Sequence, residues 1–393
     1  MRFALVVSVV AACAAAPTHP TLTTGAPASD LSTAKPATPA PAGERTAIEA
    51  RDPRVRPTID LDIIRIRATP KGPNGEVELE HVATADLFKQ ATEDAKAGRG
   101  DAAIARYREI TDDFPESQYA PTSLFNIAAI LDGRGYPVAT VGVLRQLVKR
   151  YPESRESIDG HLYIAAIEAD HAGWADAVTT LDEVLARTNL TYADRIEAGA
   201  RKGYALIELK RYDDADLALQ AAIAEWHNAT HIDDPYYIAM AYYYRGELAH
   251  RRFLEAPVRL PDDVMIADLD HKRVLAAEAY DRWRDSLDFK QAYWATAAGY
   301  QMSQIFVELW QATVKAPYPA RIEAATRRRY VAEVHDRVRE HLQKALEGHR
   351  MNIELAKAYG VDTQWSQGSE QQAKQIDEML QRDAVGAYVM PAD

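Results

Sequence analysis

Gly173-Trp-Ala-Asp-Ala177 and Arg211-Tyr-Asp-Asp-Ala215 are two copies of one short pattern, and both lie in a stretch, residues 83–219, that repeats itself. A small residue recurs there at steps of 37, 37 and 38 residues, at Ala91, Ala128, Ala165 and Gly203. Three further columns keep this spacing: a second small residue (Ala103, Thr140, Ala177, Ala215), a large residue four positions later (Tyr107, Leu144, Leu181, Leu219) and a preceding turn position (Gly100, Pro137, Trp174, Tyr212). Four columns at one period predict internal structural repeats.

Each repeat is expected to be a pair of α-helices. The first small residue sits in the middle of the first helix, where it lets the second helix approach closely. The second small residue and the large residue lie one turn apart on the second helix and fill the space between the two. Pro115 and Pro152 close the first two repeats, because proline cannot continue a helix. A lone pair cannot bury its apolar stripe, so the pairs must stack into a solenoid.

The pattern resembles the tetratricopeptide repeat, whose period is about 34 residues. The chain departs from that family in its longer period and in Asn189, which stands where a closing proline would end the third repeat. The resemblance implies an all-α helical-hairpin solenoid, with four repeats in residues 83–226 and further repeat-like and capping helices in residues 227–390. In this second part we expect helices at 235–250, 291–315, 318–359 and 370–385, and an insertion from Glu255 to about Asp270. The alternative is an irregular helical domain.

The first residues resemble an export signal. Arg2 precedes a short apolar run, which is typical of a secretory signal and shorter than the roughly 20 residues of a membrane-spanning helix. Val10-Ala-Ala-Cys13 resembles the lipobox of bacterial lipoproteins, which implies that residues 1–13 hold the signal and that Cys13 carries the lipid. Cys13 is the only cysteine, so it cannot form an internal disulfide. By resemblance to enterobacterial lipoproteins, Ala14 favours the outer membrane. The alternatives are cleavage after Ala16 with soluble export to the periplasm, and a cytoplasmic protein whose first residues are apolar by chance.

Two segments lie between this signal and the repeats. Residues 14–57 are rich in Pro, Ala and Thr, a composition that predicts a disordered, semi-extended linker and therefore a tether. Residues 58–82 contain two alternating runs, Ile59 to Ile63 and Val77 to Val82, around Pro73-Asn-Gly75, and this predicts a β-hairpin. The hairpin would cap the open end of the solenoid or add a strand to a partner's sheet.

The composition limits the function. The formal net charge is −12, which argues against nucleic acid, whose partners need basic surface, and against direct adhesion to anionic lipid. The sequence contains no Gly-rich phosphate loop, no HExxH and no pair of cysteines. His227 and His231 have metal-ligand spacing on a helix, but the run from Asn228 to Pro235 indicates that the helix ends there, so we expect no metal, no cofactor and no catalytic site.

The first helix of each repeat lines the concave face in proteins of the resembled family. Carried over by register, this geometry places ten residues toward a partner-binding groove: Phe88, Phe125, Asp132, Asp170, Tyr204, Glu208, Tyr243, Glu247, His250 and Arg251. Aromatic anchors among charges are what protein-binding surfaces use. Tyr236, Tyr237, Tyr242 and Tyr244 are expected to pack between helices instead.

The first hypothesis for function is therefore a non-enzymatic scaffold. It would be an outer-membrane lipoprotein that faces the periplasm and binds envelope proteins or peptides through its groove, in outer-membrane protein assembly, pilus and secretion machinery or motility machinery. The second hypothesis is a soluble exported enzyme or ligand-binding protein with its site in the C-terminal helical half. An enclosed pocket of titrating side chains in that half would favour the second hypothesis.

Overall fold

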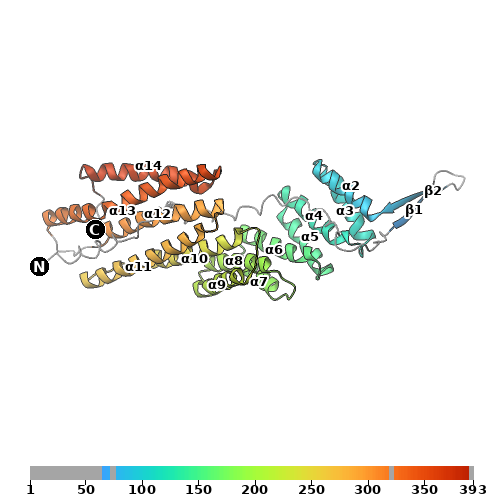
Figure 1. The fold of residues 1–393 in the computed structure, drawn as a ribbon, viewed down its shortest axis with the longest axis horizontal. Helices are drawn as coiled ribbons and strands as arrows, with labels where there is room; N and C mark the ends of the chain where they lie inside the picture. Colours follow the sequence, from blue (N-terminus) through green and yellow to red (C-terminus); the bar gives the residue numbers. More distant parts are fainter. Residues whose placement is uncertain (1–63, 71–76, 318–322, 389–393) are drawn as a thin grey trace. The chain divides into compact units, whose positions relative to one another are not determined.

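The structure is a computed structural model that describes residues 64–70, 77–317 and 323–388 (Figure 1). The chain separates into two compact units at the junction of Leu190 and Thr191. We call them the N-terminal unit, described from Ile64 to Leu190, and the C-terminal unit, described from Thr191 to Tyr388. The expected signal, Cys13 and the linker lie outside the described residues, as do residues 58–63 of the expected hairpin.

The N-terminal unit begins with a pair of antiparallel strands and continues as helical hairpins. The strands are β1 (Ile64–Pro70) and β2 (Val77–Ala83), with Ile64 opposite Ala83 and Pro70 opposite Val77. The hairpins are α2 (Thr84–Lys96) with α3 (Gly100–Asp113), α4 (Tyr119–Gly133) with α5 (Pro137–Arg150), and α6 (Arg155–Asp170) with α7 (Trp174–Leu185). Each first helix also packs on the second helix of the preceding hairpin, which is the stacking that a solenoid requires.

The C-terminal unit contains the fourth repeat, two further helical hairpins and one closing helix. Its hairpins are α8 (Tyr192–Glu208) with α9 (Tyr212–Asn228), α10 (Tyr236–Glu255) with α11 (Asp262–Leu287), and α12 (Ala292–Val314) with α13 (Ala324–Tyr359). The closing helix is α14 (Gln364–Ala384), which packs on α12 and α13. Helix α8 begins with a capping box in which Thr191 and Asp194 bond each other's backbone N–H, so this start needs no proline before it.

The two small-residue columns and the large-residue column are confirmed as the interior of the hairpins. Ala91, Ala128 and Ala165 are buried, and so are all eight residues of the second small and large columns. At Gly203 the two helices approach closely: a Cβ there would lie 2.4 Å from Leu219 Cδ2, its own column partner. At Gly246, the equivalent position of α10, a Cβ would lie 2.3 Å from Trp283 Cδ1. Glycine therefore replaces alanine where the partner side chain fills the space that a methyl would need.

The turn inside each hairpin shows a fifth column, one of backbone conformation. Gly98, Gly135, Ala172 and Lys210 all have positive φ, between 57° and 76°, and they share the 37-residue period. At each of these turns the next residue's N–H donates to a carbonyl five residues back, as from Arg99 to Asp94 and from Arg211 to Leu206. This is the usual left-handed end of a helix. The first two turns use glycine, which adopts this conformation without strain.

Three helix bounds differ from the expected ones. Helix α10 ends at Glu255, five residues beyond the expected His250. Helix α11 starts at Asp262, so the insertion expected to reach Asp270 ends at Pro261; Asp262 and Asp263 occupy its first turn, where the helix dipole favours negative charge. Helix α14 starts six residues before the expected Glu370, behind a Thr363 cap. Helix α13 is described from Ala324, and the residues before Glu323 that were expected to begin it lie outside the described part. Gly360 ends α13 with φ of 66°, as expected.

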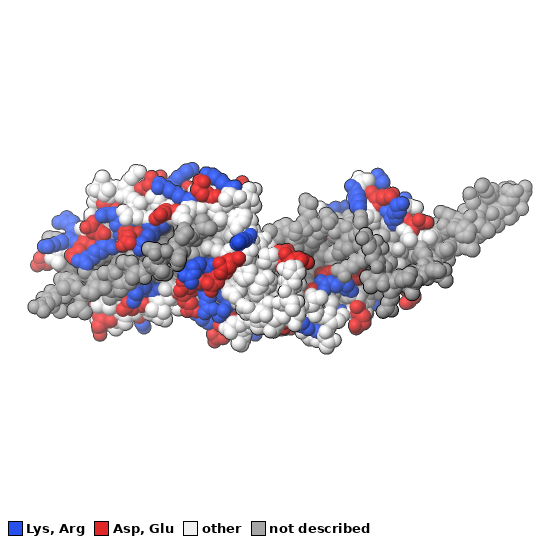
Figure 2. Space-filling view, in the orientation of Figure 1, with Lys and Arg blue, Asp and Glu red and all other residues white. Residues whose placement is uncertain are grey.

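The surface of the C-terminal unit carries both charges in alternation. Figure 2 shows Lys and Arg interleaved with Asp and Glu over its helices. On α13 many of them pair within one turn, as in Glu333 with Arg337 and Glu340 with Lys344. Such exposed pairs contribute little stability individually, and their effect is to keep the surface polar. Among the described helices, none has the length and apolar content that crossing a membrane would require.

Candidate functional site

The aromatic residues expected on the groove lie in the core. Phe88, Phe125, Tyr204 and Tyr243 are each no more than 5% exposed. Each ring meets another ring: Phe88 with Tyr107 at 5.6 Å, Phe125 with Tyr163 at 6.0 Å, Tyr204 with Tyr244 at 4.5 Å and Tyr243 with Trp294 at 5.1 Å between centroids. This corrects the expectation that Tyr204 and Tyr243 are accessible anchors, because stacking of the next hairpin covers the face on which register places them.

Four of the six charged members of the set remain partly accessible. Glu247 and His250 are buried, at 8% and 1% exposed, which corrects the expectation that they face the groove. Asp132 and Asp170 are partly exposed at the ends of α4 and α6. Asp132 accepts a hydrogen bond from Tyr163 Oη at 2.5 Å, so the first helices of two successive hairpins are joined there. In the C-terminal unit the side chains of Glu208 and Arg251 are 19% and 36% exposed. These four residues are the ones of the expected groove that a partner can touch directly.

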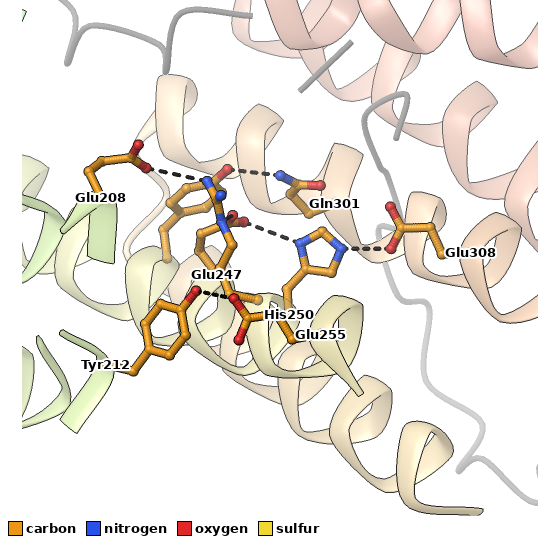
Figure 3. Close-up of polar contacts among 9 residues, drawn as sticks. Glu208, Tyr212, Glu247, His250, Glu255, Gln301 and Glu308 are labelled. Carbon is orange, nitrogen blue, oxygen red and sulfur yellow. Dashed lines mark hydrogen bonds and ion pairs between the residues drawn. The ribbon is translucent and has the colours of Figure 1, made fainter. Parts of the chain in front are cut away.

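A chain of alternating charges runs from this accessible end into the core (Figure 3). Arg251 Nη2 lies 3.3 Å from Glu208 Oε1 of α8, and Arg251 Nε donates to Glu247 Oε1 at 2.7 Å. His250 Nδ1 lies 3.4 Å from the other oxygen of Glu247. His250 Nε2 donates to Glu308 Oε2 of α12 at 2.6 Å. These hydrogen bonds and ion pairs therefore connect α8, α10 and α12.

The neighbouring charges determine the protonation states of His250 and Glu247. Burial alone would lower the pKa of His250, but Glu308 and Glu247 overcome it and raise that pKa to about 10. Burial alone would raise the pKa of Glu247, but His250 and Arg251 bring it below its usual range. His250 is thus an imidazolium that donates from both nitrogens. A general base at neutral pH must hold a free lone pair, and this histidine has none to offer.

One neighbouring contact extends the polar surface around Arg251. Tyr212 Oη donates to Glu255 Oε1 at 2.7 Å, which joins the start of α9 to the end of α10. Burial, together with the charge of Glu255, raises the pKa of Tyr212 to about 12. The accessible end of the site is therefore made of carboxylates, one guanidinium and one phenol, groups suited to polar and charged peptide segments.

Glu308 and Gln301 belong to this site and were missed by the sequence reasoning. Gln301 Nε2 donates to Tyr243 Oη at 3.2 Å, and Glu308 closes the charge chain. Both contacts span 58 residues of sequence, so the repeat register could not pair them. One signal was present: the polar residues at 301, 304 and 308 have the three- and four-residue spacing of a single helix face.

His227 and His231, for which no metal was expected, do not lie on the same helix. His227 lies in the last turn of α9, which ends at Asn228, and His231 lies in the following loop. His231 Nε2 contacts Asp233 Oδ1 at 2.7 Å on the surface. Within the described residues, no cluster of three or more His, Cys, Asp or Glu side chains has metal-binding geometry.

The hollow found in the C-terminal half is open. It has a volume of about 760 Å³, runs along α13, and is lined by Gln343, Leu346, Glu347, Arg350, Met351 and Glu354. An enclosed pocket of titrating side chains would have favoured an enzyme or ligand-binding protein. This open surface of one helix does not supply that support.

Three solved structures show what the chain is similar to. MamA (MSR-1, C2) matches with 15% identity and a TM-score of 0.32, over 52% of this chain and 98% of that one. The apo form of RapI matches with 14% identity and a TM-score of 0.39, over 70% and 97%. A tetratricopeptide repeat protein from Parabacteroides merdae matches with 11% identity and a TM-score of 0.35, over 75% and 98%. No family model and no curated protein matches the chain, so the repeat assignment rests on the helix pairs and their period.

Proposed function

We propose that this chain is a non-enzymatic adaptor that binds other proteins through the inner face of its helical hairpins. The observation that carries the proposal is the stacking of hairpins in both units, which is the architecture of extended protein-binding surfaces. The partly exposed charges of the first helices, Asp132, Asp170, Glu208 and Arg251, are the contacts offered to a partner. Because the aromatic rings are buried, polar and charged peptide segments are the partners this face suits.

The location follows from the N-terminal sequence. Val10-Ala-Ala-Cys13 and the Pro-, Ala- and Thr-rich residues 14–57 support a lipid anchor followed by a tether. A lipid at one end and a solenoid at the other would hold the adaptor at the outer membrane, facing the periplasm. Its partners would then be envelope proteins, in outer-membrane protein assembly, pilus and secretion machinery or motility machinery.

Cys13→Ser tests the anchor. A single buried lipid chain gives marginal membrane binding and several give stable binding, so loss of the modified cysteine should move the protein from the membrane fraction to the soluble fraction. The measurement is fractionation of cells grown with a labelled fatty acid, with Ala14→Ser as the matched control, which should stay labelled and membrane-bound. Unchanged fractionation of Cys13→Ser, with a mature N-terminus at Pro17 or later, would contradict the lipoprotein and favour soluble export.

A further inference from the structure

Helix α12 turns three oxygen-bearing side chains toward α10. Gln301, Gln304 and Glu308 are spaced by three and four residues, so they lie on one face of the helix. Gln301 reaches Tyr243 of α10 and Glu308 reaches His250 of α10, which identifies that face (Figure 3). All three are at most 5% exposed. We call them the α12 oxygen stripe.

Each residue of the stripe keeps one buried oxygen that no protein donor reaches. These atoms are Gln301 Oε1, Gln304 Oε1 and Glu308 Oε1. A buried acceptor without a donor costs free energy, and native cores leave few such atoms. Three such atoms lie on one helix face, and a bound donor there would satisfy them.

The charges around the stripe determine the kind of donor. Three carboxylates, of Glu208, Glu247 and Glu308, stand against three cations, of Arg251, His250 and Lys272. Lys272 already donates to the backbone oxygen of Phe253 and lies over its ring, 4.4 Å from the centroid. These six charges therefore balance. An added cation would bring an uncompensated positive charge into the core, which is costly.

We propose that the α12 oxygen stripe is an internal binding site for a neutral hydrogen-bond donor, of which water is the smallest. The bound molecule donates to at least two of the three oxygens and joins α10 to α12 beside the charge chain. This site is separate from the partner surface proposed above, because its residues are buried.

Replacing Gln304 tests the proposal, because the melting temperature should change in opposite directions with and without a bound donor. Gln304→Met keeps the volume and removes the oxygen. If a donor is bound, the variant leaves it without one of its acceptors, and the melting temperature of the full chain should fall by at least about 2 °C. If the stripe is dry, losing an unpaired buried oxygen should raise the melting temperature. Ser123→Ala is the matched control: it removes a buried hydroxyl without a partner from α4, and it should leave the melting temperature unchanged or raise it.

A high-resolution crystal structure of the unaltered full chain is the second test. Isolated density at hydrogen-bonding distance from two of the three oxygens identifies water, and larger connected density identifies a neutral organic molecule; either result supports the proposal. A dry stripe would contradict it, and so would Lys272 swung onto Glu308 Oε1 or a metal ion with short oxygen contacts.

Discussion

His250→Ala is expected to lower the free energy of unfolding of the C-terminal unit by about 3–5 kcal/mol, because it removes one partner from a buried ion pair. Glu308 and His250 side chains are only 4% and 2% exposed. Without the imidazolium, Glu308 loses its hydrogen-bond donor in the core, and Glu247 keeps only Arg251. Chemical denaturation followed by circular dichroism measures the loss.

Two variants separate the buried pair from ordinary charge effects. Arg252→Ala removes the adjacent arginine, whose partner Asp213 is 99% exposed, and it should change stability by less than about 0.5 kcal/mol. His250→Leu combined with Glu308→Leu removes both charges and should recover much of the loss, because a pair replaced by apolar residues no longer leaves a lone buried charge. A loss for His250→Ala no larger than that for Arg252→Ala would contradict the assignment.

The same contact has a signed pH dependence. The folded-state pKa of His250 is about 10, above its ordinary value of 6.5. A raised folded pKa contributes stability that is complete below the unfolded pKa and is lost as pH rises through the folded one. The stability difference between wild type and His250→Ala should thus be largest below pH 6.5 and shrink toward pH 10. Because the pKa of Glu247 is lowered, part of the contribution is also lost in acid, below its ordinary value of 4.5.

Tyr107→Ala should cost the N-terminal unit about 3–5 kcal/mol, the usual loss when a large buried aromatic side chain is truncated. Tyr107 is fully buried, and its hydroxyl lies 3.0 Å from Thr92 Oγ1 and accepts from Asn126 Nδ2 at 3.1 Å. It thus joins both helices of the first hairpin to the first helix of the second. Equilibrium unfolding in urea measures the loss.

Tyr107→Phe and Tyr136→Ala bracket this effect. The first removes only the hydroxyl and leaves the buried Asn126 amide without that acceptor, so it should cost about 1–3 kcal/mol. The second truncates a tyrosine that is 56% exposed, and it should stay within about 0.5 kcal/mol of wild type. Equal losses from all three variants would show that Tyr107 does not hold the repeat core together.

The sequence predicted what each repeat does within itself. Ala91, Ala128 and Gly203 were identified as interior positions because close helix packing demands small residues at fixed spacing. Small residues at a fixed spacing can be recognised directly in the sequence. The left-handed turn residues escaped notice although they share the period. Gly98 and Gly135 carry a recognisable residue, whereas Ala172 and Lys210 adopt the same φ without one.

The site was less predictable, because it depends on contacts between repeats. Register placed Tyr204 and Tyr243 on the inner face of their helices, but it carried no information on how closely the next hairpin would cover that face. The partner of His250 lies in α12, far along the chain, beyond the part where the columns hold. Spacing patterns describe one helix at a time, so they can mark a polar face on α12 but cannot identify the helix that this face meets.

Site-specific photo-crosslinking in intact cell envelopes tests the central claim most directly. A photoreactive amino acid replaces Glu208, which is partly exposed on the inner helix α8, and, as the matched control, Leu217, which is 67% exposed on α9 of the same hairpin. The Glu208 position should give a covalent product with a discrete envelope protein, identified by mass spectrometry, and the Leu217 position should not. The same product from both positions, or a product from Leu217 alone, would contradict binding through the inner face of the hairpins.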